Sequence, residues 1–253
     1  RRLDEANSFH LSTLMYPAHR KKQLAQIRRR LKAGLPCRVI STSLIEAGVD
    51  IDFPVVFRET AGLDSVLQAA GRCNREGKRS VNESMVCIFE GEDDAPPLFS
   101  TAIGAGREAM ARHADIASAA AIHDYFASLL DLKGRKALDE KNILSLICSE
   151  FFPFRTVAER FRLIDTSTRT IYIPRAEGTA LIERLRQGEG DRMLFLQLAQ
   201  YSVSVYETHF DALTAAGDLE VLENGTAILC NTDIYTDKTG LSLDADSAKA
   251  LFI

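Results

Sequence analysis

Apolar and polar residues alternate along the first third of the chain in a way that predicts strands and helices in turn. Short apolar runs predict buried strands, and between them leucine and isoleucine recur at helical spacing on stretches that are otherwise polar. The strands are expected over 9–15, 37–42, 54–59 and 85–89, and the helices over 18–33 and 63–73. Strands that alternate with helices predict a parallel sheet with crossover connections.

Beyond this region the pattern changes twice. An acidic segment with two prolines, 90–97, indicates a linker, and an alanine-rich stretch then predicts helices over 101–132, ended by Gly134, and over 139–148. From residue 151 onward, alternation of apolar and polar residues predicts half-buried antiparallel strands, with Asn224-Gly225 as a hairpin turn. These strands are expected over 169–174, 201–206 and 219–229, with helices over 178–187 and 209–216.

The predicted elements divide the chain into three domains. We expect an α/β domain with a partial parallel sheet over 1–95, a helical connector over 96–150 and a small α+β domain over 151–253. The helix expected over 63–73 has Asp64 or Ser65 near its N-cap.

Charge is distributed unevenly over these parts. Residues 1–89 contain fifteen Lys and Arg against nine Asp and Glu, whereas the remaining residues contain sixteen against twenty-six. The basic first part favours a polyanionic partner. The acidic remainder favours a protein partner.

Several classes of protein are excluded by what the sequence lacks. No apolar run approaches about 18 residues, so no transmembrane helix is expected, and the N-terminus has no signal-peptide character. We therefore expect a cytoplasmic protein without membrane contact. Five widely spaced cysteines without a CxxC pattern argue against a disulfide framework and a zinc site. His123-Asp124, with His113 and Asp115 nearby, lacks the further ligands that a two-metal site needs, so no metal site is expected.

Two short motifs carry the candidate chemistry. The first is STSLIEAGVD over 41–50, in a loop that leaves a predicted strand, and the second is QAAGRCNR over 68–75. Loops at the carboxyl ends of parallel strands are where such sheets bind ligands. Gly48 permits a close approach of the backbone to a ligand, and Asp50 can accept from a ribose hydroxyl or orient an arginine.

The second motif suits a triphosphate. Arg72 and Arg75 are three residues apart, so on a helix they share a face, and two guanidinium groups there can stabilise the charge of phosphoryl transfer. Gln68 lies one helical turn before Arg72 and can position a water. The alternative is that the two arginines form surface salt bridges, for example with Asp64 or Glu76.

A basic helix is predicted just after the first strand. His19 and Arg20 at its start are candidates for phosphate contact. The alternative is that its lysines and arginines form only a solvated face.

The two motifs together resemble motifs V and VI in the second RecA-like domain of superfamily two helicases. Within that superfamily the chain resembles the CRISPR-associated helicase-nuclease of type I systems, with the I-C branch nearest. Leu11-Ser12-Thr13, with Pro17, His19 and Arg20, matches what this family shows after motif IV. The resemblance is specific over residues 9–90, and the ending YTDKTGL over 235–241 is in keeping with it.

The resemblance implies a partial RecA-like sheet and an ATP-dependent enzyme that unwinds and degrades foreign target DNA. Gly48 and Asp50 would lie near the ATP ribose, while Gln68, Arg72 and Arg75 would face the phosphates. The implied partners are single-stranded DNA and the CRISPR surveillance (Cascade-type) complex. The residues implied to contact DNA are Ser12, Thr13, His19, Arg20 and Thr42.

The phosphate cradle of such an enzyme is missing from this sequence. No GxxxxGK[ST] occurs, and Gly77-Lys78-Arg79-Ser80 is only part of one. We therefore expect a piece whose nuclease and first RecA-like domains, which would bind most of the ATP and its Mg²⁺, lie elsewhere. We also expect no ATP hydrolysis by the chain alone. Asp139-Glu140-Lys141-Asn142 imitates an acidic helicase box, but no apolar strand precedes it, so a helix start is expected.

Two other functions stay open from the sequence. The chain could belong to another superfamily two helicase that works on RNA or in DNA repair. It could also serve chiefly as an interaction module, with the acidic C-terminal domain closing over the DNA channel or docking on the surveillance complex.

Overall fold

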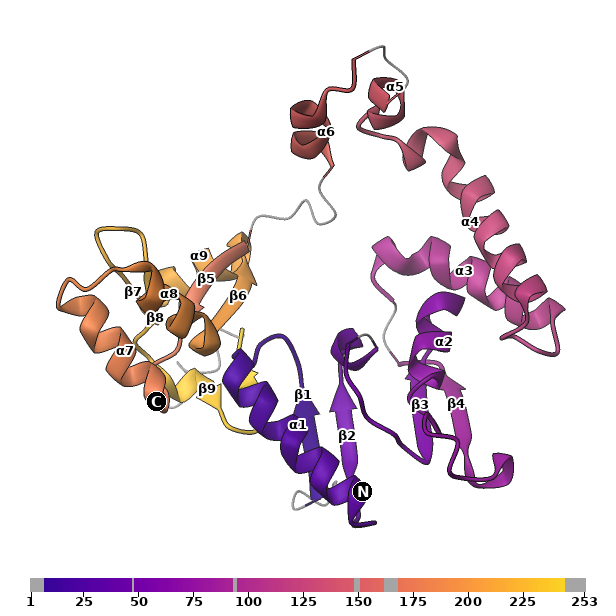
Figure 1. The fold of residues 1–253 in the computed structure, drawn as a ribbon, viewed down its shortest axis with the longest axis horizontal. Coiled ribbons are helices and arrows are strands. Elements are labelled where there is room, and N and C mark those ends of the chain that lie inside the picture. The colour runs from indigo at the N-terminus through magenta and orange to yellow at the C-terminus, as the bar shows by residue number, and fades with distance from the viewer. Residues whose placement is uncertain (1–6, 47, 93–94, 148–150, 162–167, 244–253) are drawn as a thin grey trace. The chain divides into compact units, whose positions relative to one another are not determined.

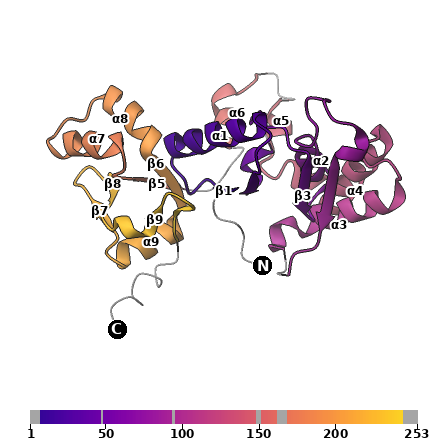
Figure 2. The same cartoon turned by 90° about the horizontal axis from the view of Figure 1, so that it is seen from below.

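The fold was obtained as a computed structural model, which describes residues 7–46, 48–92, 95–147, 151–161 and 168–243, without the side chains of 135–138. The chain forms two compact units, shown in Figures 1 and 2. Unit 1 comprises Arg1–Ile45 and Thr166–Ile253, and unit 2 comprises Glu46–Asp165. These units cut across the predicted boundaries near residues 95 and 150, and the division into three domains stays a prediction.

Unit 1 begins with the predicted strand–helix–strand element. Strand β1 (Ser8–Leu11) pairs in parallel with β2 (Arg38–Ser41), with Leu11 opposite Ser41. Helix α1 (Pro17–Lys32) connects them and starts with a proline in its first turn, where the missing N–H costs nothing. The prediction that the first strand reaches residue 15 is wrong. The backbone turns at once after Leu11, with the Met15 N–H donating to the Ser12 carbonyl at 3.3 Å.

A four-stranded sheet forms the centre of the rest of unit 1. Its strands are β5 (Thr168–Tyr172), β6 (Ser202–Tyr206), β7 (Leu219–Val221) and β8 (Ala227–Leu229), in the order β6-β5-β8-β7. The predicted hairpin joins β7 to β8, and Gly225 takes the positive φ of 80° that its turn requires. The expectation of purely antiparallel pairing is wrong, because β5 and β8 run parallel.

Helices cover both faces of this sheet. Alternate side chains of β8 point to opposite faces, so Ala227 and Leu229 belong to one core cluster and Ile228 to another. The first cluster includes Phe210 and Leu213 of α9 (Glu207–Ala215). The second is formed by α7 (Glu177–Arg186) and by α8 (Arg192–Leu198), a helix that sequence analysis did not predict. Short 3-10 turns complete this region at Ala199–Tyr201 and Thr232–Ile234.

The start of α1 packs into the same core as the C-terminal strands. The Tyr16 ring stacks on that of Tyr235, with centroids 5.3 Å apart, and belongs to the cluster that contains Leu229. The short pair β9 (Tyr235–Thr236) and β10 (Gly240–Leu241) reaches the turn after β1, where the Leu241 N–H donates to the Leu14 carbonyl at 2.9 Å. Segments more than 200 residues apart in sequence are thereby joined.

Unit 2 contains a second parallel pair, β3 (Val55–Glu59) with β4 (Met85–Phe89), and the helix α2 (Leu63–Ala70) between them. Its core is formed by Leu63 with alanines of α3 (Pro97–Arg112) and the ring of Tyr125 on α4 (Ala119–Leu138). The single helix expected over 101–132 is two helices, because Ser118 caps a new start and its hydroxyl accepts from the Ala121 N–H at 3.2 Å. Gly134 interrupts the second helix with φ 70°.

The predicted helix over 139–148 is shorter than expected. Helix α5 spans Ile143–Ile147, and the predicted end at Cys148 lies outside the described residues. The Asp139 carboxylate accepts from the Ile143 N–H at 2.6 Å and from the Leu144 N–H at 3.0 Å, which confirms this acidic stretch as a helix start. The remaining elements are α6 (Phe154–Arg160) and 3-10 turns at Ser43–Ile45 and Val81–Glu83. No helix in the described part of the chain is long and apolar enough to cross a membrane.

Candidate functional site

The second half of the first motif is anchored by Glu46. Its carboxylate pairs with the Arg58 guanidinium on β3 at 3.1 Å and accepts from the Ser65 hydroxyl on α2 at 2.9 Å. Gly48 follows with φ 72°, a conformation that favours glycine, and its position is exposed. The first motif is thus tied to the two elements that follow it in sequence.

The second motif leaves its helix earlier than predicted. Helix α2 ends at Ala70, Gly71 and Arg72 form a turn, and Cys73 pairs with Phe53 in an isolated β-bridge. The Phe53 N–H donates to the Arg72 carbonyl at 2.8 Å, and the Asn74 N–H donates to the Phe53 carbonyl at 2.9 Å. The prediction that this helix extends to residue 73 is therefore wrong, and Arg72 and Arg75 do not share a helix face. Gly62 is the N-cap, and Asp64 lies near it in the first turn, as predicted.

The two arginines occupy different environments. Arg72 is buried, and its guanidinium donates to the backbone carbonyl of Glu46 at 2.5 Å. Arg75 is 42% exposed, and its Nε lies 3.2 Å from the carboxylate of Asp50, which is 78% exposed. The structure thus brings Asp50 and Arg75 together across the two motifs. The partners expected from sequence for a salt bridge, Asp64 and Glu76, are not the ones observed for Arg75.

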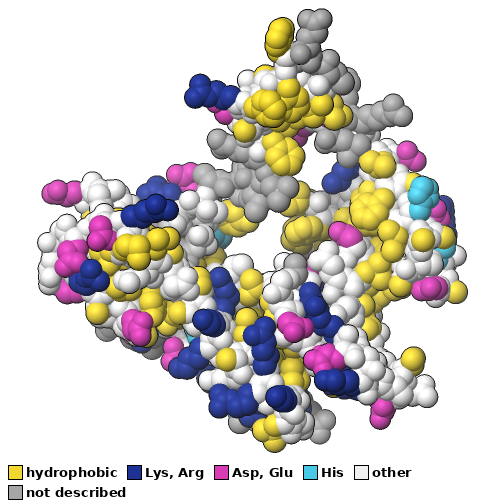
Figure 3. All heavy atoms as spheres, viewed as in Figure 1, with side chains coloured by type: hydrophobic (Ala, Val, Ile, Leu, Met, Phe, Trp, Pro, Cys, Tyr) yellow, Lys and Arg dark blue, Asp and Glu magenta, His cyan; other side chains and the backbone are white. Residues whose placement is uncertain are grey.

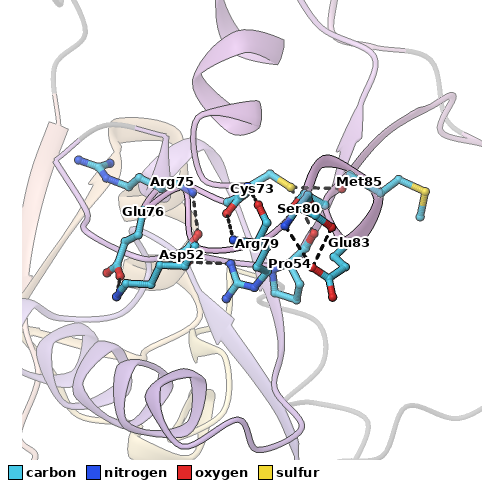
Figure 4. A network of polar contacts seen from close by, with 12 residues as sticks. Asp52, Pro54, Cys73, Arg75, Glu76, Arg79, Ser80, Glu83 and Met85 are labelled. Carbon is cyan, nitrogen blue, oxygen red and sulfur yellow. Dashed lines mark hydrogen bonds and ion pairs between the residues drawn. The ribbon is translucent and has the colours of Figure 1, made fainter.

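The loop that carries Arg75 is braced by residues that sequence reasoning missed (Figure 4). Asp52 accepts from the Arg75 backbone N–H at 2.7 Å and from the Arg79 guanidinium at 2.7 Å. Asn74 has φ 48° and exchanges two hydrogen bonds with the Arg79 backbone, at 2.8 and 2.9 Å. The available signal was the asparagine, which tolerates this conformation better than other residues with a Cβ.

Gln68 lies in the last turn of α2 and is exposed. With Gly48, Asp50 and Arg75 it belongs to the exposed polar positions of unit 2. These are residue types that suit a nucleotide, although the amide cradle for phosphates is absent from the sequence.

Three predicted DNA-contact residues lie at the carboxyl ends of β1 and β2. Ser12 and Thr13 follow β1, Thr42 follows β2, and the Thr42 N–H donates to the Leu11 carbonyl at 3.2 Å. Thr13 and Thr42 are exposed, whereas Ser12 is buried. The Ser12 hydroxyl has no hydrogen-bond partner among the described residues.

His19 faces the protein interior. Its Nδ1 lies 2.8 Å from the Tyr235 hydroxyl and its Nε2 lies 3.0 Å from the Asp237 backbone carbonyl. A carbonyl only accepts, so Nε2 carries the proton and Nδ1 accepts from Tyr235. Burial lowers the pKa of His19, and the hydrogen bond to the Asp237 carbonyl and the negative charge of Asp237 offset part of this decrease. Burial also raises the pKa of Tyr235, so both groups are neutral near pH 7.

Arg20 and the rest of α1 carry the basic charge of unit 1. The Arg20 guanidinium donates to the carbonyl of Met15 and so holds the turn after β1. Further along α1, Lys and Arg side chains gather on the surface seen in Figure 3. The exposed ones are Lys21, Lys22, Arg28, Arg29 and Lys32.

The histidine on the α3–α4 connection serves a structural contact. His113 Nε2 lies 2.8 Å from the Asp124 carboxylate. No cluster of three or more metal-ligating side chains occurs among the described residues.

Comparison with known proteins identifies the region that holds this site. A sequence model described as "CRISPR-associated nuclease/helicase Cas3, C-terminal" matches residues 3–78, which contain both motifs. Over these residues the chain is similar to the C-terminal region of Cas3. Cas3 of Haloferax volcanii is 49% identical over 55 residues, which are 22% of this chain and 6% of that protein. Cas3 of Methanothermobacter thermautotrophicus is 28% identical over 92 residues, which are 36% of this chain and 11% of that protein.

Solved Cas3 structures share the fold over most of the chain. The ADP complex of T. fusca Cas3 aligns with a TM-score of 0.55 and 14% identity, covering 90% of this chain and 33% of that one. The ATP complex aligns with a TM-score of 0.51 and 12% identity, covering 88% and 32%. The chain thus spans about a third of the solved Cas3 chains. The resemblance to this helicase-nuclease and the mixed α/β, RecA-like fold class are confirmed, and the I-C branch stays a prediction.

Proposed function

We propose that this chain is the C-terminal part of an ATP-dependent single-stranded-DNA translocase and nuclease. That enzyme would unwind and degrade foreign target DNA in the cytoplasm during CRISPR antiviral defence. The observation that carries the proposal is the Arg75 guanidinium, exposed on a braced loop within the Cas3-matching region and paired at the surface with Asp50. A positioned, water-accessible guanidinium is what the charge that develops in phosphoryl transfer requires.

The residues present fit one side of an ATP site. Arg75 would face the phosphates, Gly48 and Asp50 would lie near the ribose, and Gln68 would orient a water. Arg72 also belongs to the proposed set, although in this structure it holds the first motif through the Glu46 carbonyl. ATP and its Mg²⁺ would be bound mainly by a first RecA-like domain, because this sequence has no phosphate cradle.

The first experiment tests whether the ATP site is shared between this chain and a separate nucleotide-binding domain. The chain alone is expected not to hydrolyse ATP. In a protein that joins this chain to its nucleotide-binding domain, Arg75→Ala should lower DNA-stimulated kcat by about 10³-fold or more, the contribution of an arginine finger. Lys78→Ala is the matched control, because Lys78 is on the same loop, 73% exposed and paired with Glu76. ATPase activity of the chain alone that Arg75→Ala abolishes would contradict the proposal.

Single-stranded DNA is the proposed ligand of the carboxyl edge of β1 and β2 and of the basic face of α1. Thr13 and Thr42 are exposed at that edge, and Arg20 holds the turn beside them. Ser12 and His19 would then shape this edge from inside. Binding to a single strand should weaken with salt, with a log–log slope of about −0.7 per phosphate contacted. Replacing Lys21 and Lys22 by alanine should make that slope shallower by about 1.4; an unchanged slope would contradict this surface.

The proposed protein partner is the CRISPR surveillance complex, which would bind the acidic surface of the C-terminal part. That part would also act as a lid over the DNA channel. The contrast between fifteen basic residues in 1–89 and the acidic excess in the remainder supports this. Because Tyr16 packs into the core of unit 1, the test should use the complete chain with acidic side chains reversed, rather than isolated segments. Unchanged capture of the complex by such variants would oppose it. The match of residues 3–78 to Cas3 favours this enzyme over an RNA or DNA-repair helicase.

A further inference from the structure

We infer that Asp52, Asn74 and Arg79 form a bracket that positions Arg75, so that they are positioning residues for the reaction. We call these three residues the loop bracket. The inference deepens the proposed function and rests on it, because it assigns to the bracket the task of holding Arg75 ready for the phosphates.

Asp52 is the centre of the loop bracket. One carboxylate oxygen accepts from the Arg75 backbone N–H and the other from the Arg79 guanidinium, each at 2.7 Å. The Asp52 side chain is only 13% exposed, so these charge-assisted bonds are partly shielded from water. In Figure 4 the Arg75 backbone turns toward Asp52 while its guanidinium extends away from it. Asp52 therefore holds the Arg75 backbone and leaves the Arg75 guanidinium available for another anion.

Asn74 closes the loop from inside. Its side-chain amide donates to the Arg79 carbonyl at 2.8 Å, and its side-chain oxygen accepts from the Arg79 N–H at 2.9 Å. Its own N–H is bonded to the Phe53 carbonyl, which ties the loop to the segment that enters β3. With φ 48°, Asn74 also supplies the backbone turn that starts the loop. Asn74 and Arg79 thus close the loop that carries Arg75.

The two aspartates near Arg75 have different tasks. Asp50 contacts the guanidinium at 3.2 Å and is 78% exposed, so water and salt weaken that pair and a phosphate group can replace it. Asp52 contacts the backbone and is shielded, so its bonds persist when the guanidinium changes partner. The Arg75 guanidinium can therefore exchange Asp50 for a phosphate group while Asp52 holds the Arg75 backbone.

Hydrogen exchange of the 253-residue chain tests the geometry without nucleotide. The Arg75 amide should be protected, and Asp52→Ala should make it exchange at least about tenfold faster, the loss expected for a hydrogen bond to a charged group. Asp52→Asn keeps one oxygen that can accept from the Arg75 N–H but loses the acceptor for Arg79, so it should retain part of the protection. Amides of β4 should be unaffected in both variants. If Asp52→Ala leaves the Arg75 amide protected, the bracket is wrong.

ATP hydrolysis tests the positioning role in a protein that joins this chain to its nucleotide-binding domain. Asp52→Ala should lower kcat by about 10²-fold with little change in KM for ATP, because a misplacement of about 1 Å costs that much. Asn74→Gly keeps the backbone conformation and removes both side-chain bonds, so it should also lower kcat. Asp52→Asn, which keeps the acceptor for the Arg75 N–H only, should retain more activity than Asp52→Ala, and Lys78→Ala should leave the activity unchanged.

A double variant separates positioning from general folding damage. If Asp52 acts through Arg75, adding Asp52→Ala to Arg75→Ala should lower kcat no further. If Asp52→Ala lowers kcat in the Arg75→Ala background by the same factor as it does alone, the inference is overturned. If Arg75→Ala alone has no effect, the proposed function fails instead. Full activity of Asp52→Ala beside an inactive Arg75→Ala overturns only the bracket.

Discussion

Removing one hydroxyl, in Tyr235→Phe, tests how the N-terminal and C-terminal segments of unit 1 are joined. The Tyr235 ring is 1% exposed, and its hydroxyl lies 2.8 Å from His19 Nδ1 and 3.3 Å from the Tyr16 backbone nitrogen. Phenylalanine preserves the stacking on Tyr16 and leaves almost no void. The variant therefore isolates the two hydrogen bonds.

The expected loss of stability follows from the groups left behind. His19 is 5% exposed, so its Nδ1 would be a buried acceptor without a donor. A buried polar group that loses its partner costs about 1–3 kcal/mol, and the longer bond from the Tyr16 N–H adds a value at the lower end of the range for ordinary hydrogen bonds. We expect Tyr235→Phe to lower the free energy of unfolding of unit 1 by about 2 kcal/mol.

The measurement should report on unit 1 alone. Hydrogen exchange of the β5 and β8 amides in increasing urea does so, because both strands belong to that unit. Tyr206→Phe is the control, since Tyr206 is 56% exposed. If Tyr235→Phe changes stability by less than about 0.5 kcal/mol, the size expected for a surface substitution, the His19–Tyr235 contact does not contribute as described.

Three further predictions follow from single contacts. Burial lowers the pKa of His19 below its unfolded value of about 6.5, so the folded state favours neutral His19. The free energy of unfolding should therefore decrease as the pH drops below that value. In urea titrations at several pH values, His19→Gln should make this decrease smaller. Gly240→Ala should destabilise unit 1 by at least about 2 kcal/mol in the same titration, because φ is 85° and an added Cβ would lie 2.5 Å from the Leu14 carbonyl oxygen. Tyr125→Phe should lower the free energy of unfolding of unit 2 by about 1–2 kcal/mol, measured by exchange of α4 amides, because its hydroxyl donates to the Asp64 carboxylate at 2.7 Å.

Local pattern was enough for much of the fold. The strand–helix–strand start, the hairpin at Asn224-Gly225 and the helix start at Asp139 follow from neighbours in sequence, through apolar spacing, turn chemistry and capping. Helix ends were predicted less well. Helix α2 stops at Ala70, and Cys73 just beyond it bridges to Phe53, twenty residues earlier in the sequence, a partner that no local signal reports.

The candidate site divides in the same way. The sequence by itself determined which residues are candidates, because the two motifs place Asp50, Arg72 and Arg75 in a recognisable order and spacing. Only the tertiary structure decided that Arg72 is buried against Glu46 while Arg75 is exposed, and that His19 bonds to Tyr235. Burial and hydrogen-bond partners depend on segments that are distant in sequence, and these come together only when the apolar cores form.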